Sequence, residues 1–310
     1  MHVVVGAGSV GRAVAEQLTQ ADEAVAVITR SGTAVAGARS VAADATSLAA
    51  LMAAVPDATV IYNCANPQYH QWARDWPPIA DALLDYAEQT GAVLATCSNL
   101  YGYGPVDEPM TERTPLNATG TKGRIRADMW REAKRRHDAG RIRATEVRGS
   151  DYVTASEQSR VGSGRVVPRL LAGKSVSLIG GLDLPHTWTA PQDVARTLVT
   201  CAQDSRAWGL PWHVPSNPPR TQRQVIDDLA DSAGVRRVPV RQIPDAVLWT
   251  LGLVNPMMKE FRETAYQLQR PYILDDSLTR ETFALEPTPW SETMAAVIAP
   301  YRTATAQQWA

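Results

Sequence analysis

Short apolar runs alternate with amphipathic stretches along most of the chain. Six runs rich in valine, isoleucine and alanine have the length and composition of buried strands, at residues 3–5, 23–29, 38–44, 58–65, 92–98 and 142–148. Apolar residues recur at helical spacing between them, at residues 9–20, 47–55 and 79–91 and in a long stretch that starts near Lys122. Strands that alternate with helices in this way predict βαβ units around a buried parallel sheet.

The pattern changes after residue 150, where proline and tryptophan become frequent. Residues 193–203 and 211–214 resume the earlier pattern, so we expect them to return to the sheet. Thr221 has the side chain of a helix N-cap, and the chain after it is predicted to be mostly helical. We therefore expect a first domain of residues 1–158 that includes 190–215, and a smaller lobe of residues 159–189 and 216–310.

Composition narrows the class of protein. Hydrophobic residues make up 45% and charged residues 20% of the chain, as in soluble globular proteins. The net charge is −1, which provides no field to attract nucleic acid or membrane lipid, so the basic stretch 122–137 is expected to be a solvated helix face. Three cysteines without CxxC spacing predict neither a disulfide framework nor a metal site. Without a leader or a membrane segment, a cytoplasmic protein is expected.

The stretch "VVVGAGSVGRAV" contains Gly6, Gly8 and Gly11 as GxGxxG between a predicted strand and a predicted helix. Gly6 permits a tight turn, Gly8 lets the backbone approach a pyrophosphate, and Gly11 lets the helix pack closely on the strand. The helix N-terminus then offers N–H groups and a partial positive charge to the phosphates. This context predicts a dinucleotide site, and the alternative is a tight turn with no ligand.

The end of the second strand distinguishes the two nicotinamide cofactors. An acidic residue there would bind the adenosine ribose and repel a 2′-phosphate, but the chain has Arg30 between Thr29 and Ser31. A guanidinium suits a phosphate through charge-assisted hydrogen bonds. The sequence therefore predicts NADP(H) in preference to NAD(H), unless Arg30 is only a solvated surface residue.

Further segments follow in an ordered series: Asp44, "YNCAN" (62–66), "TCSNLYGYGP" (96–105), Lys122, "RGSDYV" (148–153) and "HTWTAPQDVARTL" (186–198). Together with the glycine turn, they resemble the extended short-chain dehydrogenase/reductases of the NAD-dependent epimerase/dehydratase family. The resemblance implies a Rossmann-type, doubly wound parallel sheet and a small, mostly helical C-terminal lobe that closes over the substrate.

Motif and resemblance together assign two sets of residues. The cofactor-binding set is Gly6, Gly8, Ser9, Val10, Gly11, Thr29, Arg30, Ser31, Asp44, Asn63, Cys64, Ala65, Asn66, Thr96, Cys97, Lys122, Gly149 and Ser150. The substrate-pocket set is Cys97, Ser98, Asp151, Tyr152, His186 and Trp188. For His186, a structural hydrogen-bonding role is the alternative.

The catalytic pair that the resemblance implies is incomplete. The family uses Tyr-x-x-x-Lys with a Ser or Thr near the end of the fifth strand, and the lysine lowers the tyrosine pKa. Lys122 matches the lysine, but Ala118 stands in place of the tyrosine and Cys97 in place of the Ser or Thr. Lys122 is expected to position the cofactor ribose, or else to be a solvated lysine. Tyr101 and Tyr152 are the candidates for another proton donor, with packing as the alternative role of each.

Three functions remain open on these observations. The first is an NADP(H)-dependent oxidoreductase that acts on a small organic molecule without the usual Tyr–Lys proton donor. The second is a non-catalytic NADP(H)-binding redox sensor, because atypical members of the superfamily also lack the pair. The third is a nucleotide-sugar epimerase or dehydratase. The resemblance also implies a homodimer formed by the helices near residues 77–90 and 122–137.

Overall fold

The computed structural model describes residues 1–157, 159–244 and 263–308. The parts of the expected lobe at residues 245–262 and 309–310, and residue 158 at the expected domain boundary, lie outside the described residues.

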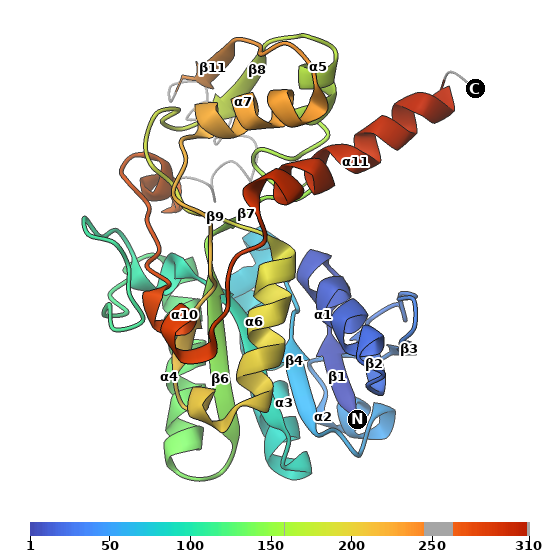
Figure 1. The fold of residues 1–310 in the computed structure, drawn as a ribbon. Coiled ribbons are helices and arrows are strands. Elements are labelled where there is room, and N and C mark those ends of the chain that lie inside the picture. The colour runs from blue at the N-terminus through green and yellow to red at the C-terminus, as the bar shows by residue number, and fades with distance from the viewer. Residues whose placement is uncertain (158, 245–262, 309–310) are drawn as a thin grey trace.

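Seven parallel strands form the central sheet, in the spatial order β10–β6–β5–β4–β1–β2–β3 (Figure 1). They are β1 His2–Val5, β2 Val25–Thr29, β3 Arg39–Ala42, β4 Val60–Asn63, β5 Val93–Asn99, β6 Arg143–Gly149 and β10 Pro211–His213. The order reverses beside β1, which pairs with β2 on one side and with β4 on the other. This is the doubly wound Rossmann arrangement that the sequence predicts, and ligands of such sheets bind beyond the strand ends at the reversal.

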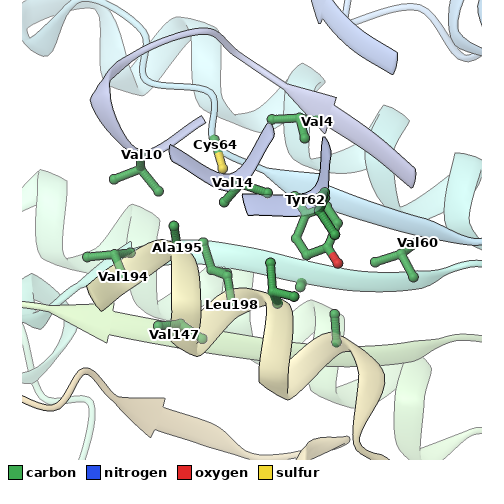
Figure 2. Packing of buried hydrophobic residues seen from close by; sticks show 14 of the residues in the cluster. Val4, Val10, Val14, Val60, Tyr62, Cys64, Val147, Val194, Ala195 and Leu198 are labelled. Atoms are coloured by element: carbon green, nitrogen blue, oxygen red, sulfur yellow. The ribbon is translucent and has the colours of Figure 1, made fainter. Parts of the chain in front are cut away.

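Helices cover both faces of this sheet. The elements are α1 Ser9–Gln20 and α6 Pro191–Gln203 on one face, and α2 Leu48–Ala54, α3 Trp72–Thr90 and α4 Thr121–Asp138 on the other. Figure 2 shows the first core, where Val10 and Val14 of α1 and Leu198 of α6 gather over strand residues such as Val4. Burial of these apolar side chains removes most of their surface from water, which is the main force that holds the layers together.

Helix α3 begins at Trp72, well before the predicted start at residue 79. Pro77 and Pro78 both lie inside the helix, although proline removes a helical hydrogen bond. Trp72 and Trp76 are buried, and the Arg126 guanidinium of α4 lies over both rings, at 4.7 and 4.3 Å from the ring centroids. These tertiary contacts outweigh the local cost of the prolines.

A smaller lobe contains its own core of buried apolar residues. Its elements are α5 Val167–Leu171, β8 Val176–Ile179, α7 Gln222–Ala233, β11 Val240–Ile243 and α11 Trp290–Gln308. Thr221 is the N-cap of α7, as predicted, and forms a capping box with Gln224. The chain after Thr221 also contains the strand β11, which pairs in parallel with β8. That partner is distant in sequence, so no local pattern reveals the strand.

The chain between the two lobes crosses several times. The short strands β7 Asp151–Tyr152 and β9 Trp188–Thr189 pair where the sheet domain meets the lobe. Further on, α10 Ser277–Phe283 lies against β10, with the Phe283 ring 4.6 Å from that of Trp212. A segment that the sequence assigns to the lobe therefore lies on the Rossmann sheet.

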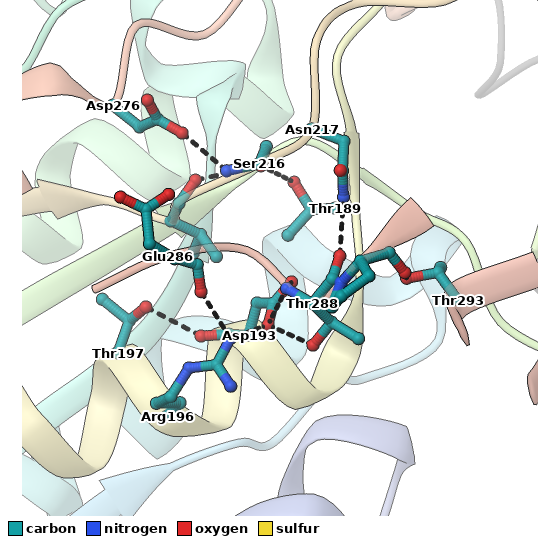
Figure 3. A network of polar contacts seen from close by, with 12 residues as sticks. Thr189, Asp193, Arg196, Thr197, Ser216, Asn217, Asp276, Glu286, Thr288 and Thr293 are labelled. Carbon is teal, nitrogen blue, oxygen red and sulfur yellow. Dashed lines mark hydrogen bonds and ion pairs between the residues drawn. The ribbon is translucent and has the colours of Figure 1, made fainter. Parts of the chain in front are cut away.

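Polar contacts hold this returning segment in place (Figure 3). The buried Asp193 carboxylate at the start of α6 accepts hydrogen bonds from the Thr288 N–H at 3.0 Å and from its hydroxyl at 2.7 Å. Arg196 pairs with the same carboxylate and donates to the Glu286 carbonyl. The Ser216 N–H donates to Asp276 at 2.6 Å.

Among the described residues, no helix is long and apolar enough to cross a membrane.

Candidate cofactor and substrate site

The turn between β1 and α1 excludes side chains at two of its glycines. Gly6 has a φ of +103°, and a Cβ there would lie 2.6 Å from the Cys64 carbonyl oxygen. A Cβ on Gly11 would lie 2.0 Å from the Gly6 carbonyl oxygen. Both positions therefore require glycine for folding alone, because no real Cβ approaches backbone atoms so closely.

Gly8 is different, because no atom lies within 4 Å of a Cβ built on it. It is the exposed N-cap of α1, and no side chain caps this helix or places an acid in its first turn. Ser9 next to it is exposed, while Val10 is buried in the core. The helix N-terminus thus faces open space with N–H groups available, which fits the pyrophosphate of a dinucleotide.

The predicted adenosine end lies after β2 and β3. Arg30 is exposed and forms no ion pair within the described part of the chain. Beside it, the Thr29 hydroxyl accepts a hydrogen bond from the Thr33 N–H at 2.7 Å, and the hydroxyls of Ser31 and Thr33 are 3.0 Å apart. Two hydrogen bonds from Thr46 lower the pKa of Asp44, and the charge of Arg30 lowers it further. The exposed guanidinium of Arg30 is therefore available to a ligand at this end of the site.

The residues after β4 line the same turn. Asn63 is 2% exposed and its side chain accepts a hydrogen bond from the Ala65 N–H at 3.3 Å. Cys64 is buried against the glycine turn, where its carbonyl meets Gly6 and its Cβ meets Gly11. Asn66 is exposed. Cys64 thus contributes backbone packing to the turn.

The ends of β5 and β6 bring most of the remaining predicted residues together. Thr96, Ser98 and Ser150 are buried, and the Ser150 N–H donates to the Thr189 hydroxyl at 3.0 Å. The Cys97 sulfur lies 3.3 Å from the Tyr152 hydroxyl, and a Cβ on Gly149 would lie 3.2 Å from the Tyr152 ring. Burial raises the pKa of the Cys97 thiol and that of the Tyr152 phenol. Neither group is therefore primed to lose a proton near neutral pH.

The predicted substrate-pocket residues Asp151, His186 and Trp188 lie in one cluster at the paired strands β7 and β9. The Asp151 carboxylate lies 3.2 Å from Arg160 and 3.3 Å from the Nε2 atom of His186. Burial alone would raise the pKa of Asp151, but Arg160 and His186 together hold it well below its usual range. The His186 ring lies between the rings of Trp188, at 4.6 Å, and Tyr272, at 5.1 Å.

A model of the NAD dependent epimerase/dehydratase family matches residues 2–211. The chain belongs to this family.

Solved structures agree with its fold. The dTDP-glucose 4,6-dehydratase of Bacillus anthracis in complex with NAD is 15% identical, with a TM-score of 0.78 over 98% of this chain and 97% of that one. The UDP-glucose 4-epimerase of Thermotoga maritima with UDP-glucose is 14% identical, with a TM-score of 0.77 over 98% and 100%. At these identities the likeness shows a shared fold. No curated protein matches the chain in sequence.

Lys122, which the resemblance assigns to the family's lysine position, is not solvated. Lys122 is 2% exposed, and its Nζ lies 3.2 Å from Glu263 Oε2 and 4.6 Å from the centre of the Tyr69 ring. Its backbone N–H donates to Glu263 Oε1 at 2.6 Å. The carboxylate therefore binds both the ammonium group and the N-terminus of α4, where a negative charge is favoured. The alternative of a solvated surface lysine was wrong.

The position four residues before Lys122 lies outside the helix. Helix α4 begins at Thr121 after the N-cap Gly120, so Ala118 precedes it. The Ala118 N–H donates to the Gly102 carbonyl at 3.2 Å, and a Cβ on Gly123 would lie 2.3 Å from the Ala118 Cβ. Residue 118 is therefore fixed in the preceding loop, and it does not stand one helical turn from Lys122.

Two residues near Lys122 were missed by sequence reasoning. Tyr69 lies on the short 3₁₀ helix η1 Tyr69–Gln71, and its hydroxyl lies 3.1 Å from that of Thr264. Glu263 comes from the lobe, so only the folded chain brings it to α4. A signal existed for Tyr69, which closely follows the end of a central strand. Burial, and then the nearby Tyr101, raise the pKa of Tyr69, and burial likewise raises that of Tyr101.

The glycine turn supports a test that separates folding from binding. Gly11→Ala should lower the free energy of unfolding by about 3 kcal/mol, because the added Cβ collides with a backbone oxygen. Gly8→Ala should cost only about 0.5–1 kcal/mol, the usual difference between glycine and alanine at an N-cap, yet weaken dinucleotide binding. Urea denaturation and calorimetric titration measure the two effects. Unchanged cofactor affinity in Gly8→Ala would contradict a phosphate site at this turn.

The Lys122–Glu263 pair makes a second prediction. Lys122→Met should lower the free energy of unfolding by about 2–3 kcal/mol, because it leaves a partly buried carboxylate without its counter-charge. The double variant Lys122→Met/Glu263→Gln should recover part of that loss. Lys134→Met is the matched control on the same helix, since its exposed pair with Asp138 is worth at most about 1 kcal/mol. Equal losses for Lys122→Met and Lys134→Met in urea denaturation would refute the role given to the pair.

Proposed function

We propose that this chain is an NADP(H)-dependent oxidoreductase that acts on a small organic molecule. The observation that supports it most is the unobstructed N-terminus of α1 at Gly8, with the exposed Arg30 at the end of the neighbouring strand β2. The three cysteines Cys64, Cys97 and Cys201 are all free, which suits the reducing cytoplasm.

The residues of the site fall into distinct binding roles in this proposal. Gly8 and the N–H groups of α1 bind the pyrophosphate, and Arg30 binds the 2′-phosphate through charge-assisted hydrogen bonds. Lys122 positions the nicotinamide ribose, as the family resemblance implies. When bound, the nicotinamide would donate a hydride to the substrate or accept one from it. The residues at the ends of β5 and β6, with Cys97 and Tyr152 in contact, form the wall beside it.

The proton of the reaction needs another source than the family's tyrosine. Ala118 cannot supply one, and burial raises the pKa values of Tyr69, Tyr101 and Tyr152. Lys122 is held by a carboxylate, so its charge is already balanced. These features favour a reaction that takes its proton from water or from the substrate itself, such as reduction of an activated alkene or an imine.

Two other functions remain candidates within the family. A redox sensor that binds NADP(H) without catalysis would also tolerate the loss of the tyrosine. A nucleotide-sugar epimerase or dehydratase would match the activity named for the similar solved structures. The missing phenol weighs against this second alternative, because that chemistry relies on proton transfer by the Tyr–Lys pair.

Cofactor selectivity tests the proposal directly. We expect calorimetry to show tighter binding of NADPH than of NADH, because Arg30 replaces the acidic ribose ligand. Arg30→Ala should reduce the NADPH advantage by about 1–3 kcal/mol, the contribution of a lost charge-assisted hydrogen bond, and should leave NADH affinity unchanged. Arg206→Ala is the control, an exposed arginine that precedes β10. Equal affinity of the wild type for the two cofactors would contradict the proposal.

We further propose that the enzyme is a homodimer that pairs through α3 and α4. These helices lie side by side, and Arg136 of α4 contacts Asp85 and Glu88 of α3. A surface groove of about 540 Å³ runs along α4 beside Trp130 and Leu116. The charges of α4 form ion pairs within the helix, which reduces the cost of burying them.

Light scattering at micromolar concentration should therefore give twice the chain mass of 33.7 kDa. Arg131→Glu on the outer face of α4 should shift the population toward monomer, because it places an unpaired acid beside Asp128 at the proposed interface. A wild type that remains at 33.7 kDa would reject the dimer.

A further inference from the structure

Three neighbouring strands of the sheet each carry one polar side chain at the same level. Asn63 of β4 is the register partner of Thr96 of β5, and Thr96 is the register partner of Glu146 of β6. All three residues are buried. A row of polar groups, which we call the polar row, therefore crosses the centre of the sheet.

The polar row lies on the face of the sheet that α3 and α4 cover. Successive side chains of a strand point to opposite faces, so each member of the row shares its face with the residue two positions earlier. Those residues are Ile61, Leu94 and Ala144, which belong to the core beneath these helices. Polar side chains at such positions need partners, because an unpaired polar group in an apolar core is costly.

A cavity of about 20 Å³ lies between the polar row and these two helices. All three members of the row line it. The helices contribute mostly apolar walls, from Ala80, Leu83, Leu84, Met129, Trp130 and Ala133. One water needs about 10–15 Å³ on this measure, so the cavity has room for a water and not for a larger molecule.

Hydrogen-bond capacity remains on every member of the row. The Asn63 side-chain oxygen accepts from the Ala65 N–H at 3.3 Å, and Glu146 Oε1 accepts from Arg148 at 2.6 Å. Among the described residues, the Asn63 amide nitrogen, the Thr96 hydroxyl and Glu146 Oε2 have no partner. The row therefore presents a donor, a hydroxyl and an acceptor to a single cavity.

We propose that this cavity is a binding site for one ordered water. The water accepts a hydrogen bond from the Asn63 amide and donates one to Glu146 Oε2, and the Thr96 hydroxyl is its third partner. Buried waters typically make about three hydrogen bonds to groups that lack other partners. An apolar ligand would leave all three groups unpaired, so it does not fit the cavity.

The water links the glycine turn to a buried ion pair. Asn63 holds the Ala65 N–H, and a Cβ on Gly6 would lie 3.0 Å from the Ala65 Cα, so this segment packs on the turn. At the other end, Glu146 pairs with Arg148, and both side chains are buried. The water completes the hydrogen bonds of the Glu146 carboxylate, which a buried ion pair needs to offset its loss of hydration.

The first test needs no variant and no cofactor. A high-resolution crystal structure of the wild-type chain should show one water in this cavity, within hydrogen-bond distance of the Glu146 carboxylate and the Thr96 hydroxyl. A cavity without density, or one that the Trp130 ring fills, would overturn the proposal. The result does not depend on the proposed function, because the water site is the same whichever cofactor binds.

The second test uses Thr96→Val, which keeps the shape of the side chain and removes its hydroxyl. With the water in place the variant loses a hydrogen bond, so its melting temperature should fall by about 1–3 °C. Thr145→Val is the matched control on β6, where the buried Thr145 hydroxyl donates directly to the Leu210 carbonyl at 3.1 Å. Its melting temperature should fall by a similar amount.

A dry cavity gives the opposite sign. Thr96→Val would then remove an unpaired hydroxyl, so its melting temperature would stay the same or rise while that of Thr145→Val falls. That outcome would overturn the water site. If Thr96→Val does not fold, the wild-type crystal structure decides alone.

Discussion

The first turn of α1 lies on the ends of β1 and β4 at backbone contact, and the geometry of the whole site depends on that contact. Side chains are excluded at Gly6 and Gly11 because the Cys64 and Gly6 carbonyls occupy the space. This close approach sets the axis of α1 and leaves Gly8 at its open tip. The register of the parallel sheet then places the other predicted site residues, from Arg30 to the ends of β5 and β6, relative to this helix N-terminus.

A second constraint is that Ala118, and not a tyrosine, stands four residues before Lys122. Lys122 is buried, and Ala118 lies in a loop before the helix begins. The lysine instead forms an ion pair with Glu263 of the lobe, which also binds the helix N-terminus. One contact thereby balances the charge of Lys122 and ties the lobe to the cofactor domain. In the proposed function Lys122 has a positioning role, and the proton comes from water or from the substrate.

Sequence reasoning succeeded where the information is local. The bounds of α1, the N-cap at Thr221 and the return of β10 to the sheet follow from hydrophobic spacing and capping residues, and the structure confirms them. It failed where contacts between distant segments decide. Helix α3 starts early, where Trp72 and Trp76 contact Arg126, and β11 forms because β8 pairs with it. Glu263 and Tyr272 reach the site from the lobe, and no sequence motif around them identifies them as site residues.

A crystal structure of the protein with NADP⁺ bound tests the central claim most directly, because the claim concerns where the phosphates bind. The account predicts the pyrophosphate at the N-terminus of α1 beside Gly8 and the 2′-phosphate in contact with the Arg30 guanidinium. A cofactor whose pyrophosphate lies away from Gly8, or whose 2′-phosphate is solvated without contact to Arg30, would contradict it.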